Sequence, residues 1–128
     1  DRAIVTEAAV CPGRSVIQVG YREVGLAAIR ASDRVVVDAW GDFADRSAKG
    51  LFQMYRAGLF QPQDVAADLA ALLLDGWRAA PDHSVYFSSF GLNVFDIALA
   101  ARVLQDAERG GIGQRQSLFT GALDDHLR

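Results

Sequence analysis

The strongest structural signal in the chain is the segment Val85-Tyr86-Phe87-Ser88-Ser89-Phe90-Gly91-Leu92-Asn93-Val94-Phe95-Asp96-Ile97-Ala98. Its first three residues are apolar and aromatic, so they predict a short strand. The turn from Ser88 to Gly91 then leads directly into a long helix, which Gly110-Gly111 terminates. A strand, a tight turn and a helix in immediate succession are typical of α/β proteins.

The helix after this turn has an unusually wide apolar surface. Apolar residues recur at helical spacing and form one stripe, with a second stripe beside it. A surface of this width predicts packing on two sides, against the helix's own sheet and against another domain or subunit. The first stripe is Val94, Ile97, Ala98, Ala101 and Leu104, and the second is Phe95, Leu99 and Val103.

Three further apolar runs precede this segment and predict strands at residues 3–6, 15–19 and 34–38. They are short and nearly uninterrupted, which is typical of parallel strands buried on both faces. The other elements that we expect are helices at 24–31, at 47–57 and from Pro62 to Gly76, and a final edge strand at 116–119.

The order strand, strand, strand, two helices, strand, long helix, strand indicates an α/β fold with a doubly wound parallel sheet. A dinucleotide-binding unit of this class begins with a strand, a glycine-rich turn and a helix. Nothing before Gly20 has that form. The sequence therefore predicts the C-terminal half of a Rossmann-type sheet, and we expect the front half, with its phosphate-binding turn, to lie elsewhere.

Composition restricts the classes of function. The 128 residues carry 13 Lys and Arg against 16 Asp and Glu, and this net charge of −3 argues against a nucleic-acid binder. A single cysteine, Cys11, excludes a disulfide framework and a multi-cysteine zinc site, and we expect no metal. The apolar stretches are too short to span a bilayer and no secretory signal is visible. We expect a soluble, cytoplasmic protein that binds no membrane.

The turn from Ser88 to Gly91 is the best candidate for a binding site. It joins the carboxyl end of a strand to a helix N-terminus, where hydroxyls and free amides converge on a ligand. Ser89 acting only as a helix cap explains the same residues. Two other strand ends leave similar alternatives open: Arg22 suits an anionic substrate group or a local pair with Glu23, and Asp38 suits a site carboxylate or a solvated strand end.

The same turn resembles a signature of the ornithine cyclodeaminase/μ-crystallin family, Phe-x-Ser-x-Gly-x-x-x-x-Asp, which runs here from Phe87 to Asp96. An Ala-rich helix and Gly111-Ile112-Gly113 follow it, as in the family. Within the family, Val37-Asp38-Ala39-Trp40 looks closest to the dehydrogenases that oxidise N-(2-amino-2-carboxyethyl)-glutamate with NAD in 2,3-diaminopropionate synthesis. The resemblance covers nearly all of this chain, but only about the C-terminal two-fifths of a family member.

The resemblance implies a division of the chain and a set of roles. Residues 1–91 would be the second half of an NAD(P)-binding Rossmann domain, and residues 92–128 a helix and strand of the dimerisation and substrate domain. Cofactor contacts are implied for Thr6, Ser89, Phe90 and Gly91, with Ser89 near the nicotinamide. The family commonly places an Asp and then a Lys in the loop after the strand that ends at Gly20.

That loop is shortened here to Tyr21-Arg22-Glu23 and holds no Asp. Arg22 and Glu23 are the substitutes that we expect for the catalytic groups. Binding of NAD or NADP would need an N-terminal half, or a companion chain, that carries the glycine-rich motif, so we expect this chain to be inactive alone.

Two classes of function follow. In the first, the chain is the C-terminal part or companion subunit of an NAD(P)-dependent oxidoreductase acting on a small amino acid or imine. In the second, it is a non-catalytic assembly or regulatory subunit derived from that family. The Ser89-Phe90-Gly91 turn favours the first, whereas the shortened loop and the absent glycine motif favour the second. Either class predicts a homo- or hetero-oligomer.

Overall fold

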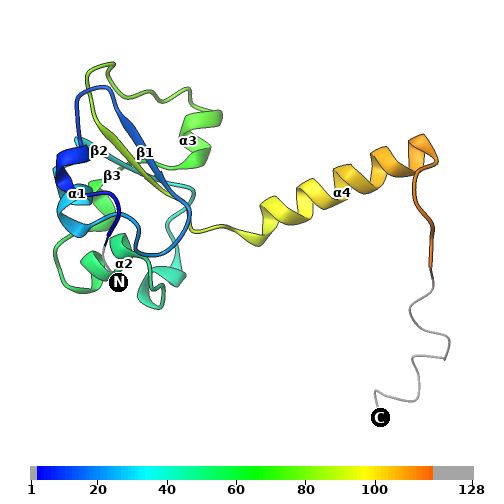
Figure 1. The fold of residues 1–128 in the computed structure, drawn as a ribbon, viewed down its shortest axis with the longest axis horizontal. Helices are drawn as coiled ribbons and strands as arrows, with labels where there is room; N and C mark the ends of the chain where they lie inside the picture. The colour runs from blue at the N-terminus through cyan, green and yellow to red at the C-terminus, as the bar shows by residue number, and fades with distance from the viewer. Residues whose placement is uncertain (1–2, 117–128) are drawn as a thin grey trace, which may run out of the picture. The chain divides into compact units, whose positions relative to one another are not determined.

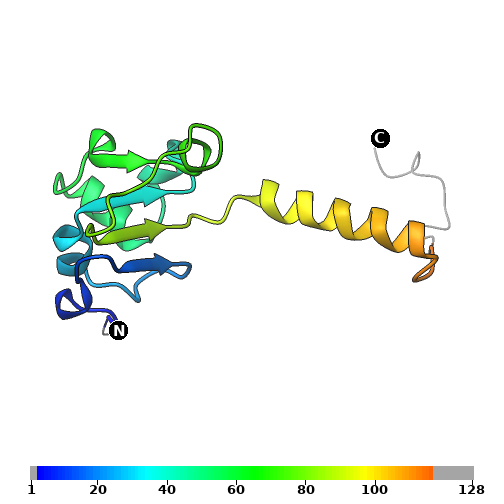
Figure 2. The same ribbon diagram turned by 90° about the horizontal axis from the view of Figure 1, so that it is seen from above.

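The computed structural model describes residues 3–116 and divides the chain into two compact units, Asp1–Leu92 and Asn93–Arg128. The first unit holds a four-stranded sheet with short helices, and the described part of the second holds the helix α4 (Asn93–Gly110) (Figures 1 and 2). The last edge strand that we expect, at 116–119, falls after Gln116 outside the described residues.

The sheet of the first unit is parallel throughout, with the strand order β1-β4-β2-β3. The fourth strand in the chain is thus inserted between the first two, and this confirms the predicted α/β class with a parallel sheet. The strands are β1 (Ser15–Gln18), β2 (Arg34–Val37), β3 (Val65–Ala67) and β4 (Val85–Ser88).

Helices cover both faces of the sheet. The chain passes through α1 (Leu26–Ala31) from β1 to β2 and through α2 (Gly50–Arg56) from β2 to β3, moving in one direction across the sheet. It then returns through α3 (Leu69–Leu73) to β4. Because parallel crossovers are right-handed, the reversal of direction puts α3 on the opposite face (Figure 1). The sheet is therefore doubly wound.

The hydrophobic core lies between the sheet and the pair α1 and α2. Alternate residues of the two central strands point into it, because successive side chains of a strand face opposite sides. Leu51 on α2 and Tyr86 on β4 are both 0% exposed. The core consists mainly of Val24, Ala28, Ile29, Val35, Val37, Leu51, Met54, Phe60 and Tyr86.

Strand β1 departs from the prediction of a strand buried on both faces. It pairs only with β4, and Ile17 and Val19 are 68% and 74% exposed. Val36 on the central strand β2 is 1% exposed, as predicted. The face of β1 that carries Ile17 and Val19 is therefore largely uncovered within the described residues.

The prediction of a strand at residues 3–6 is wrong. Val5 forms one isolated parallel bridge with Val24 and does not extend the sheet. The backbone of the loop after β1 occupies its hydrogen-bonding groups, since Val5 N donates to Glu23 O (2.8 Å) and Gly25 N donates to Val5 O (2.9 Å). Local pairing with this short loop takes the place of pairing with a strand.

The prediction of one helix from Pro62 to Gly76 is also wrong. Val65–Ala67 is the strand β3, paired with β2, and helix α3 begins only after Asp68. The Asp68 carboxylate accepts a hydrogen bond from Ala71 N (2.8 Å) and caps this helix. A short apolar run fits a strand as well as a helix, and pairing with β2 decides the outcome here. The helices expected at 24–31 and 47–57, and the long helix expected between Gly91 and Gly110-Gly111, are confirmed as α1, α2 and α4.

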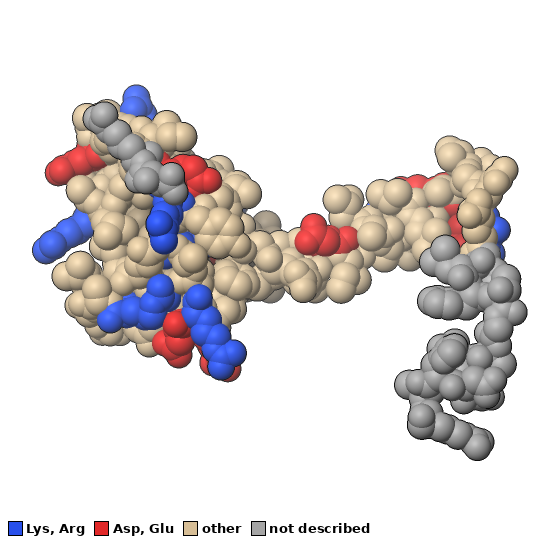
Figure 3. All heavy atoms as spheres, turned by 60° about the horizontal axis from the view of Figure 1, so that its bottom comes forward, with Lys and Arg blue, Asp and Glu red and all other residues tan. Residues whose placement is uncertain are grey.

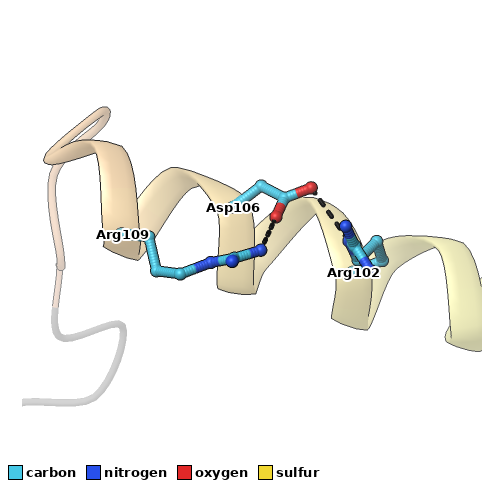
Figure 4. A network of polar contacts seen from close by, with 3 residues as sticks. All are labelled: Arg102, Asp106 and Arg109. Atoms are coloured by element: carbon cyan, nitrogen blue, oxygen red, sulfur yellow. Dashed lines mark hydrogen bonds and ion pairs between the residues drawn. The ribbon is translucent and has the colours of Figure 1, made fainter.

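Helix α4 contains no buried residue. On its surface Asp106 pairs with Arg102 (3.0 Å) and with Arg109, one turn to either side (Figure 4). Exposed pairs of this kind contribute about 0.2–0.5 kcal/mol each. No helix within the described residues is long and apolar enough to cross a membrane. The large apolar side chains that α4 exposes are Val94, Phe95, Ile97, Leu99, Val103 and Leu104.

Two matched leucine substitutions test this account of the core. Leu51→Ala leaves a cavity at a fully buried site and should lower the free energy of unfolding by about 2–5 kcal/mol. Leu74→Ala, at a side chain that is 83% exposed, should change it by less than about 0.5 kcal/mol. Urea denaturation followed by circular dichroism measures both, and equal losses would show that the core is misplaced.

Candidate functional site

The carboxyl ends of three strands meet at one edge of the first unit's sheet. Gln18, Val37 and Ser88 lie side by side in the registers of β1, β2 and β4. A polar residue ends or directly follows each of these strands, in contrast to the apolar strand centres: Gln18 for β1, Asp38 for β2 and Ser88 for β4. In open α/β sheets ligands bind outside this edge, so it is the place to look for a site.

The carboxylate of Asp38 ties this edge together. It is only 6% exposed, and its Oδ2 accepts hydrogen bonds from Gly91 N (2.9 Å) and Ser89 Oγ (3.3 Å). Its Oδ1 accepts from Ala39 N (2.9 Å). The structure thus decides between the two interpretations of Asp38: the carboxylate is buried and binds the turn after β4, and it is not a solvated strand end.

The turn after β4 has the geometry that this bridge requires. Gly91 has a φ of +82°, in the left-handed region that glycine enters without a steric penalty. Its amide consequently faces Asp38. The hydroxyl of Ser89 donates its proton to the same carboxylate. This hydrogen bond links the turn to Asp38 across the sheet edge and does not cap the helix that follows.

A second polar network is buried on the face of the sheet that α1 and α2 cover. The Tyr86 hydroxyl donates to Gln18 Oε1, and Gln18 Nε2 donates to Glu23 Oε2 (3.1 Å). Tyr86 is 0% and Gln18 is 2% exposed. Burial raises the pKa of Tyr86 to about 12, whereas the hydrogen bond from Gln18 holds the pKa of Glu23 below its ordinary value. The network therefore keeps the phenol neutral and the carboxylate ionised.

Ser88 lies between these two networks, on the same face of β4 as Tyr86. Its side chain is 0% exposed, and its Oγ has no hydrogen-bond partner within the described residues. A buried hydroxyl without a partner is costly, so its position at a candidate site is informative.

Lys49, which precedes α2, is a buried member of the site that the sequence did not indicate. It is 2% exposed, and its Nζ donates to Val19 O (2.6 Å) and Gly20 O (2.7 Å). Burial lowers the pKa of Lys49, although the nearby carboxylates of Glu23 and Asp38 oppose this shift. A lone Lys before an apolar helix is typical of a surface residue, and only the tertiary structure shows that it clamps the loop after β1.

The candidate cofactor residues are brought together only in part. Ser89 and Gly91 meet at Asp38, and Phe90 stacks on Phe43 with ring centroids 3.8 Å apart. Thr6 is exposed, and its side chain makes no capping hydrogen bond to the short 3-10 helix that follows it.

The candidate catalytic residues Arg22 and Glu23 are neighbours with different surroundings. Glu23 belongs to the network of Gln18 and Tyr86, whereas Arg22 lines a separate cavity of about 150 Å³ beside Gly25 and Gln53. Within the described residues no ion pair joins Arg22 to Glu23, so the local pair considered from the sequence does not form. Their catalytic roles remain predictions.

A larger cavity, of about 860 Å³, opens beside the loop after β1. Aromatic and charged side chains line it together, chiefly Tyr21, Asp42, Phe43, Asp45, Arg46 and Phe90. Acidic and basic side chains also lie next to one another on the face of the first unit drawn in Figure 3. Within the described residues no cluster of His, Cys, Asp and Glu has the geometry of a metal site.

The fold of the chain is similar to that of the Δ1-pyrroline-2-carboxylate reductase of Thermococcus litoralis, solved in complex with NADH and L-proline. The TM-score is 0.73 and 22% of the aligned residues are identical. The match covers 89% of this chain but 37% of the reductase, so the chain spans well under half of that protein's length. No protein-family model and no curated protein matches the sequence. The likeness shows a shared fold.

Alkaline titration tests the buried position of Tyr86. The folded protein holds this proton up to a pKa of about 12, whereas the unfolded chain loses it near 10.0. The phenol's contribution to stability is therefore complete below pH 10 and is lost as the pH rises to 12, a fall of about 2–3 kcal/mol.

The test compares the free energies of unfolding of the wild-type protein and Tyr86→Phe, with Tyr55→Phe as the matched control. Lys49 titrates in all three proteins, so the difference between their unfolding free energies across this pH range isolates the phenol. Wild type and Tyr55→Phe should lose stability together, and Tyr86→Phe should lose less. Parallel curves for all three would contradict the burial of Tyr86.

Proposed function

We propose that the chain is the C-terminal part, or a companion subunit, of an NAD(P)-dependent oxidoreductase that acts on a small amino acid or imine. The observation that carries the proposal is the turn from Ser88 to Gly91, held by Asp38 at the carboxyl edge of a doubly wound sheet. The similar fold of a reductase solved with NADH and L-proline supports it. The resemblance noted in the sequence extends the proposal to enzymes of the 2,3-diaminopropionate type.

The residues of this edge fit a nicotinamide dinucleotide. The glycine backbone at Gly91, which has no side chain to obstruct a ligand, is a group of the kind that lets a carboxamide or a ribose approach closely. Ser89 and Phe90 would complete the contact surface. When bound, the dinucleotide supplies or accepts the hydride. Because the glycine-rich motif is absent from this sequence, the pyrophosphate would be bound by an N-terminal half or a companion chain.

Each polar residue of the site then has a task. Asp38 orients the turn, and Lys49 holds the backbone carbonyls of the loop after β1. Glu23, kept ionised by Gln18, is the group that we propose to exchange a proton with the substrate.

One observation favours a second function, that of a non-catalytic assembly or regulatory subunit. The described part of α4 exposes six large apolar side chains and buries none of its residues. Such a surface is typical of a protein–protein contact and would serve a homo- or hetero-oligomer. This alternative needs neither a cofactor nor a substrate.

Kinetics of the native assembly that contains this chain test the proposal. The assembly should oxidise NADH or NADPH in the presence of a cyclic imine such as Δ1-pyrroline-2-carboxylate. Asp38→Ala frees the turn after β4 and should weaken cofactor binding about tenfold, since hydrogen bonds to a charged group are lost. Asp75→Ala, at an exposed residue, is the matched control and should leave it unchanged.

Thermal unfolding separates a folding defect from a local one. If Asp38→Ala unfolds, Ser89→Ala, which removes one bond of the bridge, replaces it and should weaken cofactor binding by a smaller factor. An assembly that binds neither NADH nor NADPH and turns over no imine would contradict the proposed function and favour the assembly subunit.

A further inference from the structure

We propose that the cavity beside Tyr21 binds the amino- or imino-acid substrate as a zwitterion, with Arg46 holding the carboxylate. Asp42 and Asp45 would face the positively charged nitrogen, and the apolar part of the substrate would lie between aromatic walls. The inference deepens the proposed function and rests on it, because it identifies the residues that select the substrate. Neither the sequence patterns nor the fold comparison pointed to Arg46.

One wall of the cavity is a rigid aromatic pair. The rings of Phe43 and Phe90 are stacked, with centroids 3.8 Å apart and an interplanar angle of 18°. Both rings also contact the edge or face of Phe52, which is 1% exposed. The pair is therefore anchored in packed structure, and it offers an apolar surface that needs no rearrangement before a ligand binds.

The other wall, Tyr21, is fixed by contacts with the residues at the start of α2. Its side chain is 61% exposed, but its carbonyl accepts a hydrogen bond from Gly50 N (3.1 Å). The Nζ of Lys49 lies 5.3 Å from the centroid of the Tyr21 ring, within cation–π range. Lys49 thus acts as a positioning residue that fixes the loop carrying this wall.

The charges at the cavity are of both signs and none of them is neutralised by the protein. Arg46, Asp42 and Asp45 form no ion pair within the described residues. They belong to, or directly follow, the 3-10 helix Asp42–Asp45, whose backbone is fixed by Arg46 N donating to Phe43 O (3.1 Å). A ligand with one charge would satisfy only one sign, whereas a zwitterion supplies a partner for both.

The size of the cavity agrees with this class of ligand. Small-molecule sites have volumes of about 300–1,000 Å³ and combine apolar walls with a few polar groups. The volume here, about 860 Å³, accepts a cyclic or apolar side chain beside the charged groups.

Titration of the 128-residue chain, labelled with ¹⁵N, tests this proposal without any cofactor. L-proline is the probe because it carries both charges on an apolar ring. It should shift the backbone amide signals of Tyr21, Phe43 and Phe90. Two analogues each lack one charge: pyrrolidine has no carboxylate and cyclopentanecarboxylate has no nitrogen. Each should bind at least about tenfold more weakly than L-proline.

Two arginine variants provide the matched comparison. Arg46→Gln should weaken L-proline binding about tenfold. Arg30→Gln, at an exposed residue in the last turn of α1 and outside the cavity, should leave binding unchanged. Arg46 is itself exposed, so its substitution should leave the unfolding temperature unchanged. Asp45→Asn is the second variant and should weaken L-proline more than cyclopentanecarboxylate.

The outcomes separate this inference from the proposed function. It is overturned if L-proline shifts no amide at the cavity, if the two analogues bind as tightly as L-proline, or if Arg46→Gln binds like Arg30→Gln. In the native assembly, Arg46→Gln should raise the KM for the imine about tenfold with little change in kcat. Turnover with an unchanged KM would overturn the cavity assignment and leave the oxidoreductase intact. Binding of L-proline at the cavity in an assembly that never oxidises NADH or NADPH would contradict the proposed function instead.

Discussion

The carboxylate of Asp38 is the constraint on which the functional edge of this chain depends. It directly follows β2, but its hydrogen bonds reach the turn after β4, the strand inserted between β1 and β2. The backbone carbonyl of the same residue accepts from Leu69 N (3.4 Å), at the start of α3. One residue thus joins two central strands and the helix on the opposite face. A buried charge is costly unless it is fully hydrogen-bonded, and the three donors to this carboxylate meet that condition.

A second group of polar residues supports the same edge from the side of α2. Lys49 binds the carbonyls of Val19 and Gly20, while Tyr86 and Gln18 connect the floor of the sheet to Glu23. An apolar core would cost less free energy at this place. Buried polar networks are retained mainly where they fix the geometry of a site. Ser88, the buried hydroxyl without a partner, lies between the two groups. The arrangement is that of an edge prepared for a ligand, which is why we interpret it as part of an oxidoreductase and not only as a scaffold.

Much of this fold follows from the sequence, and the exceptions have physical causes. The runs at 34–38 and 85–87 are β-branched or aromatic and predicted their strands, because central parallel strands bury both faces. The run at 15–19 predicted its strand as well, although β1 lies at the edge of the sheet and exposes Ile17 and Val19. Val65–Ala67 was assigned to a helix, since three residues are too few for periodicity to separate a helix from a strand. The turn from Ser88 to Gly91 was predictable from its place between strand and helix. Lys49 and Arg46 were not, because their roles depend on contacts with Tyr21 and with the cavity, which no local pattern encodes.

We propose that this edge binds a dinucleotide only when a glycine-rich N-terminal half completes the sheet. Native mass spectrometry of the purified material, recorded with and without NADH, tests it most directly. We expect that a second segment or chain of complementary size accompanies these 128 residues, and that the complex gains the mass of one cofactor per site. The 128-residue chain found alone or as a homo-oligomer, with no added mass in the presence of NADH, would contradict it.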